Sequence, residues 1–256
     1  MLLRSVTKHV KDQNWTAVFI DFFIVVVGVF IGIQVANWNE SRTDKIRATG
    51  YLERIAENLE TDTQNFNNRI AFWSTVSEFG FTALNFAESG EKGELSDWET
   101  LLSFFQASQL AEFVADKSTY NEMSSAGELG LIQNEAIRNK ISNYYTGSDN
   151  WILSDKPVYR EHIRGYIPIL IQKYIWTNCY KTDTNLQQSM LDCEPPVAQE
   201  QIADLLVEIS GDKMLIRELR YWMSTMQVAT LIGNNQLSTG KELYDMIKTE
   251  LEAKNK

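Results

Sequence analysis

The sequence predicts an all-α protein in which one N-terminal transmembrane helix is followed by a bundle of about six helices. Three observations predict this class. Residues 17–38 are almost entirely apolar, all four prolines lie after residue 156, and no stretch alternates between apolar and polar residues for long enough to require a sheet. The first 156 residues therefore contain no obligatory helix breaker. With 44% hydrophobic residues, the 256-residue chain can also bury a sizeable core.

The apolar run is long enough to cross a bilayer. Trp15 to Trp38 is 24 residues, which as an α-helix cover about 36 Å, slightly more than the hydrocarbon core. The two tryptophans bracket the run where amphipathic rings prefer to lie. A cleaved signal peptide is the competing interpretation, but its apolar core is only about 7–15 residues and ends at small residues. We therefore predict a head at 1–14, an uncleaved transmembrane helix at 15–38 and a main domain at 39–256.

The flanking charges do not orient this helix. Three basic residues precede the span and three follow it closely, so the positive-inside rule gives no preference. The two cysteines, Cys179 and Cys193, lie in a loop-like stretch of the main domain. A structural disulfide between them would need an oxidising compartment, and two free thiols are the alternative. With the short head also considered, we expect the N-terminus in the cytoplasm and the main domain outside.

Asp21 is the one ionisable residue inside the span. It lies six residues beyond Trp15, about 9 Å along the axis, which is below the headgroups but short of the midplane. A carboxylate costs about 2.5–3.5 kcal/mol at the bilayer centre and less near an edge. Three interpretations stay open. Asp21 reaches the near interface or is protonated, it pairs with a polar group on a neighbouring helix, or it carries protons in a motor-like complex.

Gly28 and Gly32 favour the second interpretation. Glycines four residues apart form a flat stripe on which another helix can approach closely, although such pairs also arise by chance in apolar segments. The spacing places Asp21, Gly28 and Gly32 on one helix face, and Gln34 could hydrogen-bond across such an interface. If the helix self-associates through that stripe, at least one of the facing carboxyls should be protonated.

The main domain begins with a long helix that leaves the membrane. Between residues 41 and 89 apolar residues recur at helical spacing, and Gly90 ends the pattern. This stripe predicts a core face rather than a cofactor pocket, and it consists of Leu52, Ile55, Leu59, Phe66, Ile70 and Trp73. Nearby acids such as Glu57, Glu60 and Asp62 are expected on a solvated face.

Caps and breakers divide the rest of the chain. Ser96 to Glu99 form a capping box that begins a helix ending near Val114. Thr119 to Glu122 repeat the device for a short helix that ends at Gly127. Further helices are expected over about 134–145, 157–178 with a kink at Pro168, 197–210, and 212–253 with an interruption near Gly233.

The chain lacks the patterns of common catalytic and metal sites. His9 and His162 are far apart, and neither has a ligand three or four residues away, while two cysteines do not complete a zinc site. His162 is expected to face solvent. A Gly-rich phosphate loop, a GxSxG elbow and an HExxH motif are absent. We therefore expect no enzymatic activity, no cofactor and no metal.

Charge narrows the range of partners. The formal net charge is −10, and residues 41–256 carry 21 basic and 31 acidic side chains. An acidic domain repels phosphate backbones, so we expect no nucleic acid among its partners. The expected partners are the lipid bilayer and either further copies of the chain or another membrane protein.

Two stretches of the sequence carry a family pattern. They are IDFFIVVVGVFIGIQVANWNE, with Asp21, Gln34 and the exit Asn37–Glu40, and STYNEMSSAGELGLIQNEAIRNKISNYY at 118–145. Together they resemble an uncharacterised family of bacterial single-span membrane proteins with a helical extracytoplasmic domain. The resemblance departs at Asp21, where Glu is expected. It implies a bacterial inner-membrane location, a periplasmic domain and a helical fold, and it brings no activity with it.

The sequence leaves two classes of function open. The first is a non-enzymatic bitopic membrane protein whose extracytoplasmic domain binds, senses or organises an envelope complex. The second is a subunit of a proton-driven motor, because Phe19–Phe22 and the following apolar run look like the single span of energy-transducing stator proteins, in which an Asp carries protons. Residues 41–256 do not resemble the corresponding domains of those proteins.

Overall fold

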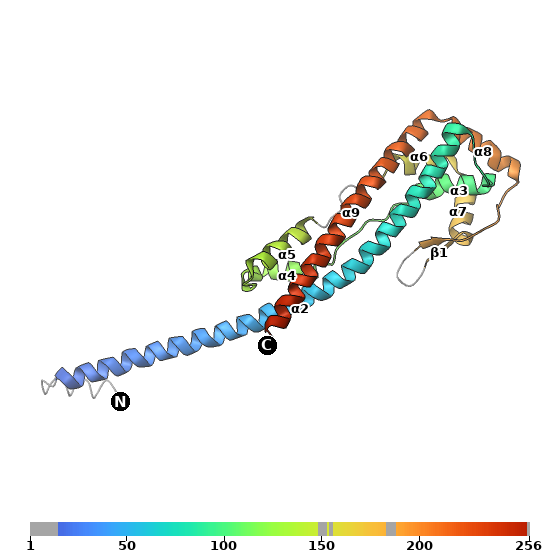
Figure 1. Cartoon of the computed structure of the whole chain (residues 1–256). Coiled ribbons are helices and arrows are strands. Elements are labelled where there is room, and N and C mark those ends of the chain that lie inside the picture. The colour runs from blue at the N-terminus through green and yellow to red at the C-terminus, as the bar shows by residue number, and fades with distance from the viewer. Residues whose placement is uncertain (1–14, 148–152, 154–155, 183–187, 255–256) are drawn as a thin grey trace.

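Two long antiparallel helices form the frame of the protein (Figure 1). The computed structural model describes residues 15–147, 153, 156–182 and 188–254, so the predicted head at 1–14 lies outside the described residues. Helix α2 (Trp15–Ser89) is a single helix of 75 residues. Helix α9 (Lys213–Lys254) packs along the second part of α2 and leaves the first part projecting alone (Figure 1).

Shorter elements lie along this pair. They are α3 (Asp97–Ala107), α4 (Ser118–Ser125), the 3₁₀ helix η1 (Glu128–Leu131), α5 (Glu135–Gly147), α6 (Val158–Tyr166), α7 (Ile169–Asn178), the antiparallel strands β1 (Tyr180–Thr182) and β2 (Gln188–Met190), and α8 (Gln199–Gly211). The regular elements among the described residues are thus helices apart from one short hairpin, which confirms the all-α class. The predicted bundle of about six helices is not confirmed, because two long helices carry short helices on their sides.

The core lies between α2 and α9. The predicted stripe on α2 is buried, with Leu52, Leu59 and Trp73 fully inaccessible, and so are Leu215 and Trp222 on α9. Gly233 does not interrupt α9, contrary to the prediction. A Cβ atom at this position would lie 2.8 Å from Cζ3 of Trp73, so the glycine admits a large side chain between the helices and the helix continues.

Two helix boundaries differ from the predictions for tertiary reasons. The capping box at Ser96 is present, but α3 ends at Ala107 rather than near Val114. The chain then runs along α2 without regular secondary structure, with Phe113 buried and Val114 69% exposed. At Thr119 the predicted capping box is missing, because the hydroxyl group of Thr119 donates to Oδ1 of Asn58 on α2, 2.7 Å away.

The region 157–190 is broken more sharply than the sequence predicts. Pro168 separates α6 from α7 instead of kinking one helix, because the residue before it, Ile167, takes an extended conformation, and Pro168 becomes the N-cap of α7. The structure joins Cys179 to Cys193 in a disulfide that closes the β1–β2 hairpin. Part of this predicted loop, residues 183–187, lies outside the described residues. The indole of Trp98 donates to the carbonyl oxygen of Cys193 at 2.8 Å, which fastens the hairpin to α3.

Candidate functional site

The first part of α2 is the one candidate membrane span among the described helices. By length and composition it could cross a bilayer, with a mean hydropathy of 2.6 in its most apolar window and none of that window buried. Its apolar side chains point outward all round the helix, and Phe22, Val29 and Ile31 are each more than half exposed. Such a helix has no core face to bury against its own domain.

The helix places the predicted contact residues on two sides. Asp21, Gly28 and Gly32 share one face, whereas Gln34 lies about 200° around the axis from Gly32. A Cβ atom at either glycine would meet nothing within 4 Å. Within the part of the chain that the structure describes, Oδ2 of Asp21 has no hydrogen-bond partner. The contact face therefore stays a prediction, and a neighbour on the glycine stripe would not reach Gln34.

Beyond the span, α2 carries a second, polar stripe that we call the polar ladder. Its members recur every three or four residues and so lie on one face. They contact α4, η1, the extended segment after α3, and α5. The polar ladder consists of Asp44, Arg47, Tyr51, Arg54, Asn58 and Asp62. Three of these precede the apolar stripe residues Leu52, Ile55 and Leu59 by one position, so the two stripes adjoin.

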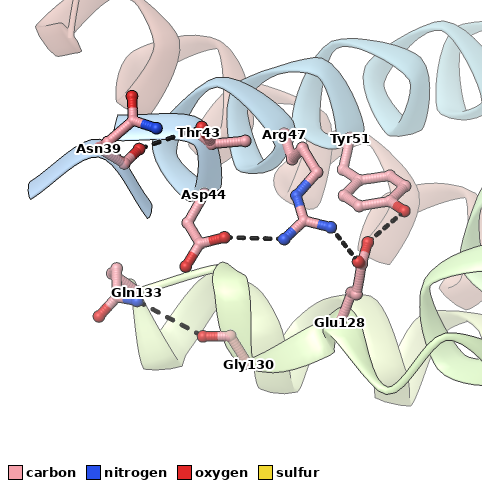
Figure 2. A network of polar contacts seen from close by, with 8 residues as sticks. All are labelled: Asn39, Thr43, Asp44, Arg47, Tyr51, Glu128, Gly130 and Gln133. Atoms are coloured by element: carbon pink, nitrogen blue, oxygen red, sulfur yellow. Dashed lines mark hydrogen bonds and ion pairs between the residues drawn. The ribbon is translucent and has the colours of Figure 1, made fainter. Parts of the chain in front are cut away.

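Glu128 anchors η1 to the end of the polar ladder nearest the apolar part of α2 (Figure 2). One carboxylate oxygen accepts from Nη1 of Arg47 at 2.5 Å, and the other accepts from the hydroxyl group of Tyr51 at 2.6 Å. Nη2 of Arg47 also donates to Asp44 at 2.8 Å. The hydrogen bond to Glu128, followed by burial, raises the pKa of Tyr51 to about 12. Tyr51 therefore remains a neutral donor at physiological pH.

The next two residues of the polar ladder, Arg54 and Asn58, attach α4 and the segment before it to α2. Arg54 donates to both oxygens of Glu122, at 2.7 and 3.0 Å, which is the bidentate geometry that an arginine fork favours. This bond lowers the pKa of Glu122. Asn58 then donates to Asp116 at 2.6 Å and accepts from Thr119 at 2.7 Å. The amide of Asn58 thus fixes two positions on either side of the start of α4.

Asp62 is the innermost rung and is only 1% exposed. Its two oxygens accept from the backbone N–H of Asp116 at 2.9 Å and from the hydroxyl group of Tyr144 on α5 at 3.0 Å. Burial raises the pKa of Asp62, and these two hydrogen bonds oppose that effect. The prediction of a solvated Asp62 is therefore wrong, whereas Glu57 and Glu60 are exposed as expected.

The sequence analysis does not predict the polar ladder, although its spacing is visible in the sequence. Six polar residues at spacings of three or four beside an apolar stripe are the pattern of a second packed face. Charged residues on a helix are usually solvated, so the burial of Asp62 and the ion pairs of Arg47 and Arg54 become visible only when the partners on α4, η1 and α5 are placed.

His162 and the possible metal ligands are the remaining candidates for a reactive site among the described residues. His162 is exposed as expected, and its Nδ1 lies 2.8 Å from Oε2 of Glu218. Among the described residues, no group of three or more His, Cys, Asp or Glu side chains could hold a metal ion. An open hollow of about 1130 Å³ adjoins the ladder between Asn37 and Glu53 and is also lined by Leu131 and Lys254.

The polar ladder ties α2 to several shorter elements of the domain. Because α2 is continuous, α4 and α5 are tied to the same helix that projects as the candidate span. A displacement of that helix must therefore move or break the rungs. Comparison with known proteins adds no constraint, since no family model matches the chain and neither a curated protein nor a solved structure matches it significantly. The family resemblance stays a prediction.

Proposed function

We propose that this chain is a non-enzymatic bitopic protein of a bacterial inner membrane, with residues 15–38 across the bilayer and a periplasmic helical domain that binds or senses. The observation that carries this proposal is the continuity of α2. One helix joins an unburied apolar segment to the frame of the domain, so ligand-induced shifts of the domain reach the membrane through a single rigid element.

The disulfide supports the periplasmic side for the domain. Cys179 and Cys193 are joined in the structure, and such bonds persist mainly in oxidising compartments. The test is labelling of intact spheroplasts with a membrane-impermeant maleimide, before and after an impermeant reductant. We expect labelling only after reduction and without lysis.

Two variants control this experiment. A Cys179→Ser, Cys193→Ser double variant should not be labelled at all. The same variant with an added Ser5→Cys in the head should be labelled only after lysis. If the wild-type cysteines were labelled only after lysis and without reductant, the domain would be cytoplasmic and the orientation would be refuted.

Self-association through Asp21, Gly28 and Gly32 is part of the proposal, since these residues share a face that the domain leaves uncovered. In-membrane crosslinking of a Val25→Cys chain lacking its two native cysteines, compared with the same chain carrying Gly28→Ile and Gly32→Ile, tests it. We expect the crosslinked dimer to decrease strongly in the isoleucine variant, because bulky side chains prevent close helix approach. Equal crosslinking would rule out this face.

The motor hypothesis is distinguished by Asp21→Asn. A proton-carrying carboxylate cannot be replaced by an amide, so a motor subunit would assemble normally and lose all function. For the sensory or scaffolding role we expect the variant to insert, to fold and to keep its function, because an amide retains hydrogen-bonding capacity at lower cost in lipid.

A further inference from the structure

Two arginines on α6 are partly buried at the end of α3 without a carboxylate partner. Arg160 and Arg164, the guanidinium pair, are one helical turn apart and both intermediate in exposure. Nη1 of Arg160 donates to the carbonyl oxygen of Ser108 at 2.6 Å. Arg164 donates to the hydroxyl group of Ser108 at 3.2 Å and to Oε1 of Gln109 at 3.3 Å. Within the described residues, neither arginine forms an ion pair.

The neutral partners leave most of this charge uncompensated. Ser108 is the C-cap of α3, and the end of a helix carries about half a negative charge. About one and a half positive charges therefore remain at the guanidinium pair. Burial lowers the pKa of Arg160, and burial together with the charge of Arg160 lowers the pKa of Arg164 to about 10. Arg47, Arg54 and Arg220 each have an acidic partner. Within the described residues Arg42, Arg69, Arg138 and Arg217 form no ion pair either, so the guanidinium pair differs from them in bringing two such groups close together.

The surroundings hold the donors in fixed orientations. The guanidinium carbon of Arg164 lies 5.0 Å from the ring centroid of Phe105 and 5.5 Å from that of Trp176. Gln109, which is 3% exposed, accepts from Arg164 and donates to the hydroxyl oxygen of Tyr180 at 3.0 Å. The hydroxyl group of Tyr180 thus accepts one bond and keeps its own hydrogen for a further acceptor.

We propose that Arg160, Arg164 and Tyr180 form a binding site for a soluble oxyanion, the carboxylate or phosphate group of a ligand. Two planar guanidinium forks offer ten N–H groups, of which the protein uses three in the hydrogen bonds described above. Paired forks match the geometry of both anions. The rest of the domain is acidic, so this site differs from it in carrying excess positive charge.

A lipid headgroup is not the source of the anion. The end of α3 lies level with Trp73 of α2, whose indole donates to the carbonyl oxygen of Ala111 at 2.8 Å. From Trp38, at the end of the predicted span, to Trp73 is 35 residues, or about 52 Å of helix. Figure 1 shows α3, α6 and α7 at the end of the molecule away from the projecting helix. The ligand must therefore come from solution.

The inference rests on the proposed binding role and names its ligand class. The test is isothermal titration of inorganic phosphate, and separately of succinate, into the full chain in a nonionic detergent at constant ionic strength. We expect at least one of the two to bind with a dissociation constant below about 1 mM. The Arg160→Lys, Arg164→Lys double variant should bind at least tenfold more weakly, since lysine keeps the charge but loses the fork.

Arg217→Lys on the exposed face of α9 is the matched control and should bind like the wild type. Tyr180→Phe, which removes only a hydroxyl group, should weaken binding severalfold. This variant tests the proposal if the double variant fails to fold. No binding by the wild type, or equal binding by the double variant and the control, would overturn the proposal. Titration in detergent does not depend on orientation, so its failure and a failure of the labelling experiment are distinguishable.

Discussion

The two parts of α2 have the same secondary structure and opposite surroundings. In the first part apolar side chains cover the whole circumference, and Phe30 and Trp38 are 60% and 66% exposed. In the second part they are confined to one stripe, and Phe66 and Trp73 are 2% and 0% exposed. A helix that is apolar on all sides requires an apolar solvent, whereas a striped one requires a protein partner. The two parts of α2 thus differ in the surroundings that their side chains favour.

The largest expected difference between the two parts comes from removing equivalent tryptophans. Trp73→Ala should lower the free energy of unfolding by about 3–5 kcal/mol, because a large buried side chain is replaced by a cavity. Trp38→Ala should change it by less than about 0.5 kcal/mol. Urea unfolding of the detergent-solubilised chains, followed by circular dichroism, measures both. Equal effects would mean that the two parts do not differ in packing.

A charge in the middle of the first part should affect insertion and leave the domain intact. Val26→Arg should raise the apparent free energy of membrane insertion by about 2.5–3.5 kcal/mol and so disfavour insertion, because arginine is costly at the centre of a spanning helix. Alkaline extraction of membranes should then release the variant. Val228→Arg, at a valine that is 43% exposed on α9, is the control and should stay in the membrane fraction. Retention of both variants would argue against a span at 15–38.

Replacing a glycine by alanine should also affect stability differently in the buried seam between α2 and α9 and in the first part of α2, by a smaller amount. Gly233→Ala should destabilise the domain by about 1–3 kcal/mol through overpacking, because its Cβ would lie 2.8 Å from the ring of Trp73. Gly28→Ala, with nothing within 4 Å, should leave domain stability unchanged. Thermal unfolding of the two variants in parallel gives the comparison. A stable Gly233→Ala chain would show that the seam between α2 and α9 can separate to admit a methyl group.

The smallest effect concerns Asp62, and it depends on pH. Burial raises the pKa of this carboxyl, so the folded protein keeps the proton to a higher pH than the unfolded chain. The contribution of Asp62 to stability is therefore present at low pH and lost as pH rises through the raised value. Asp62→Asn removes this dependence and keeps an acceptor for the N–H of Asp116.

Unfolding of the wild type and Asp62→Asn between about pH 4 and pH 7 measures the effect. The variant should gain stability relative to the wild type as pH rises, while carboxyls with lowered pKa, such as those of Asp116 and Glu122, act alike in both chains. A relative loss for the variant with rising pH would mean that the bonds to Tyr144 and Asp116 outweigh burial.

The sequence predicted those features whose signals are local. The helix from the apolar run to Gly90, the capping box at Ser96 and the cap at Asn134, whose side chain accepts from the N–H of Ile137 at 3.3 Å, are all present. Each depends on residues within one or two turns of each other, and periodicity or capping chemistry is sufficient to specify it.

Only the tertiary structure decided the fate of residues whose partners are distant in the sequence. The burial of Asp62 depends on Tyr144, the missing cap at Thr119 depends on Asn58, and the uninterrupted helix at Gly233 depends on Trp73. The guanidinium pair likewise exists only where α6 meets the end of α3. In each case the contact joins two segments that are far apart in the sequence, and its free energy depends on both. Neither segment, read alone, shows whether the contact will form.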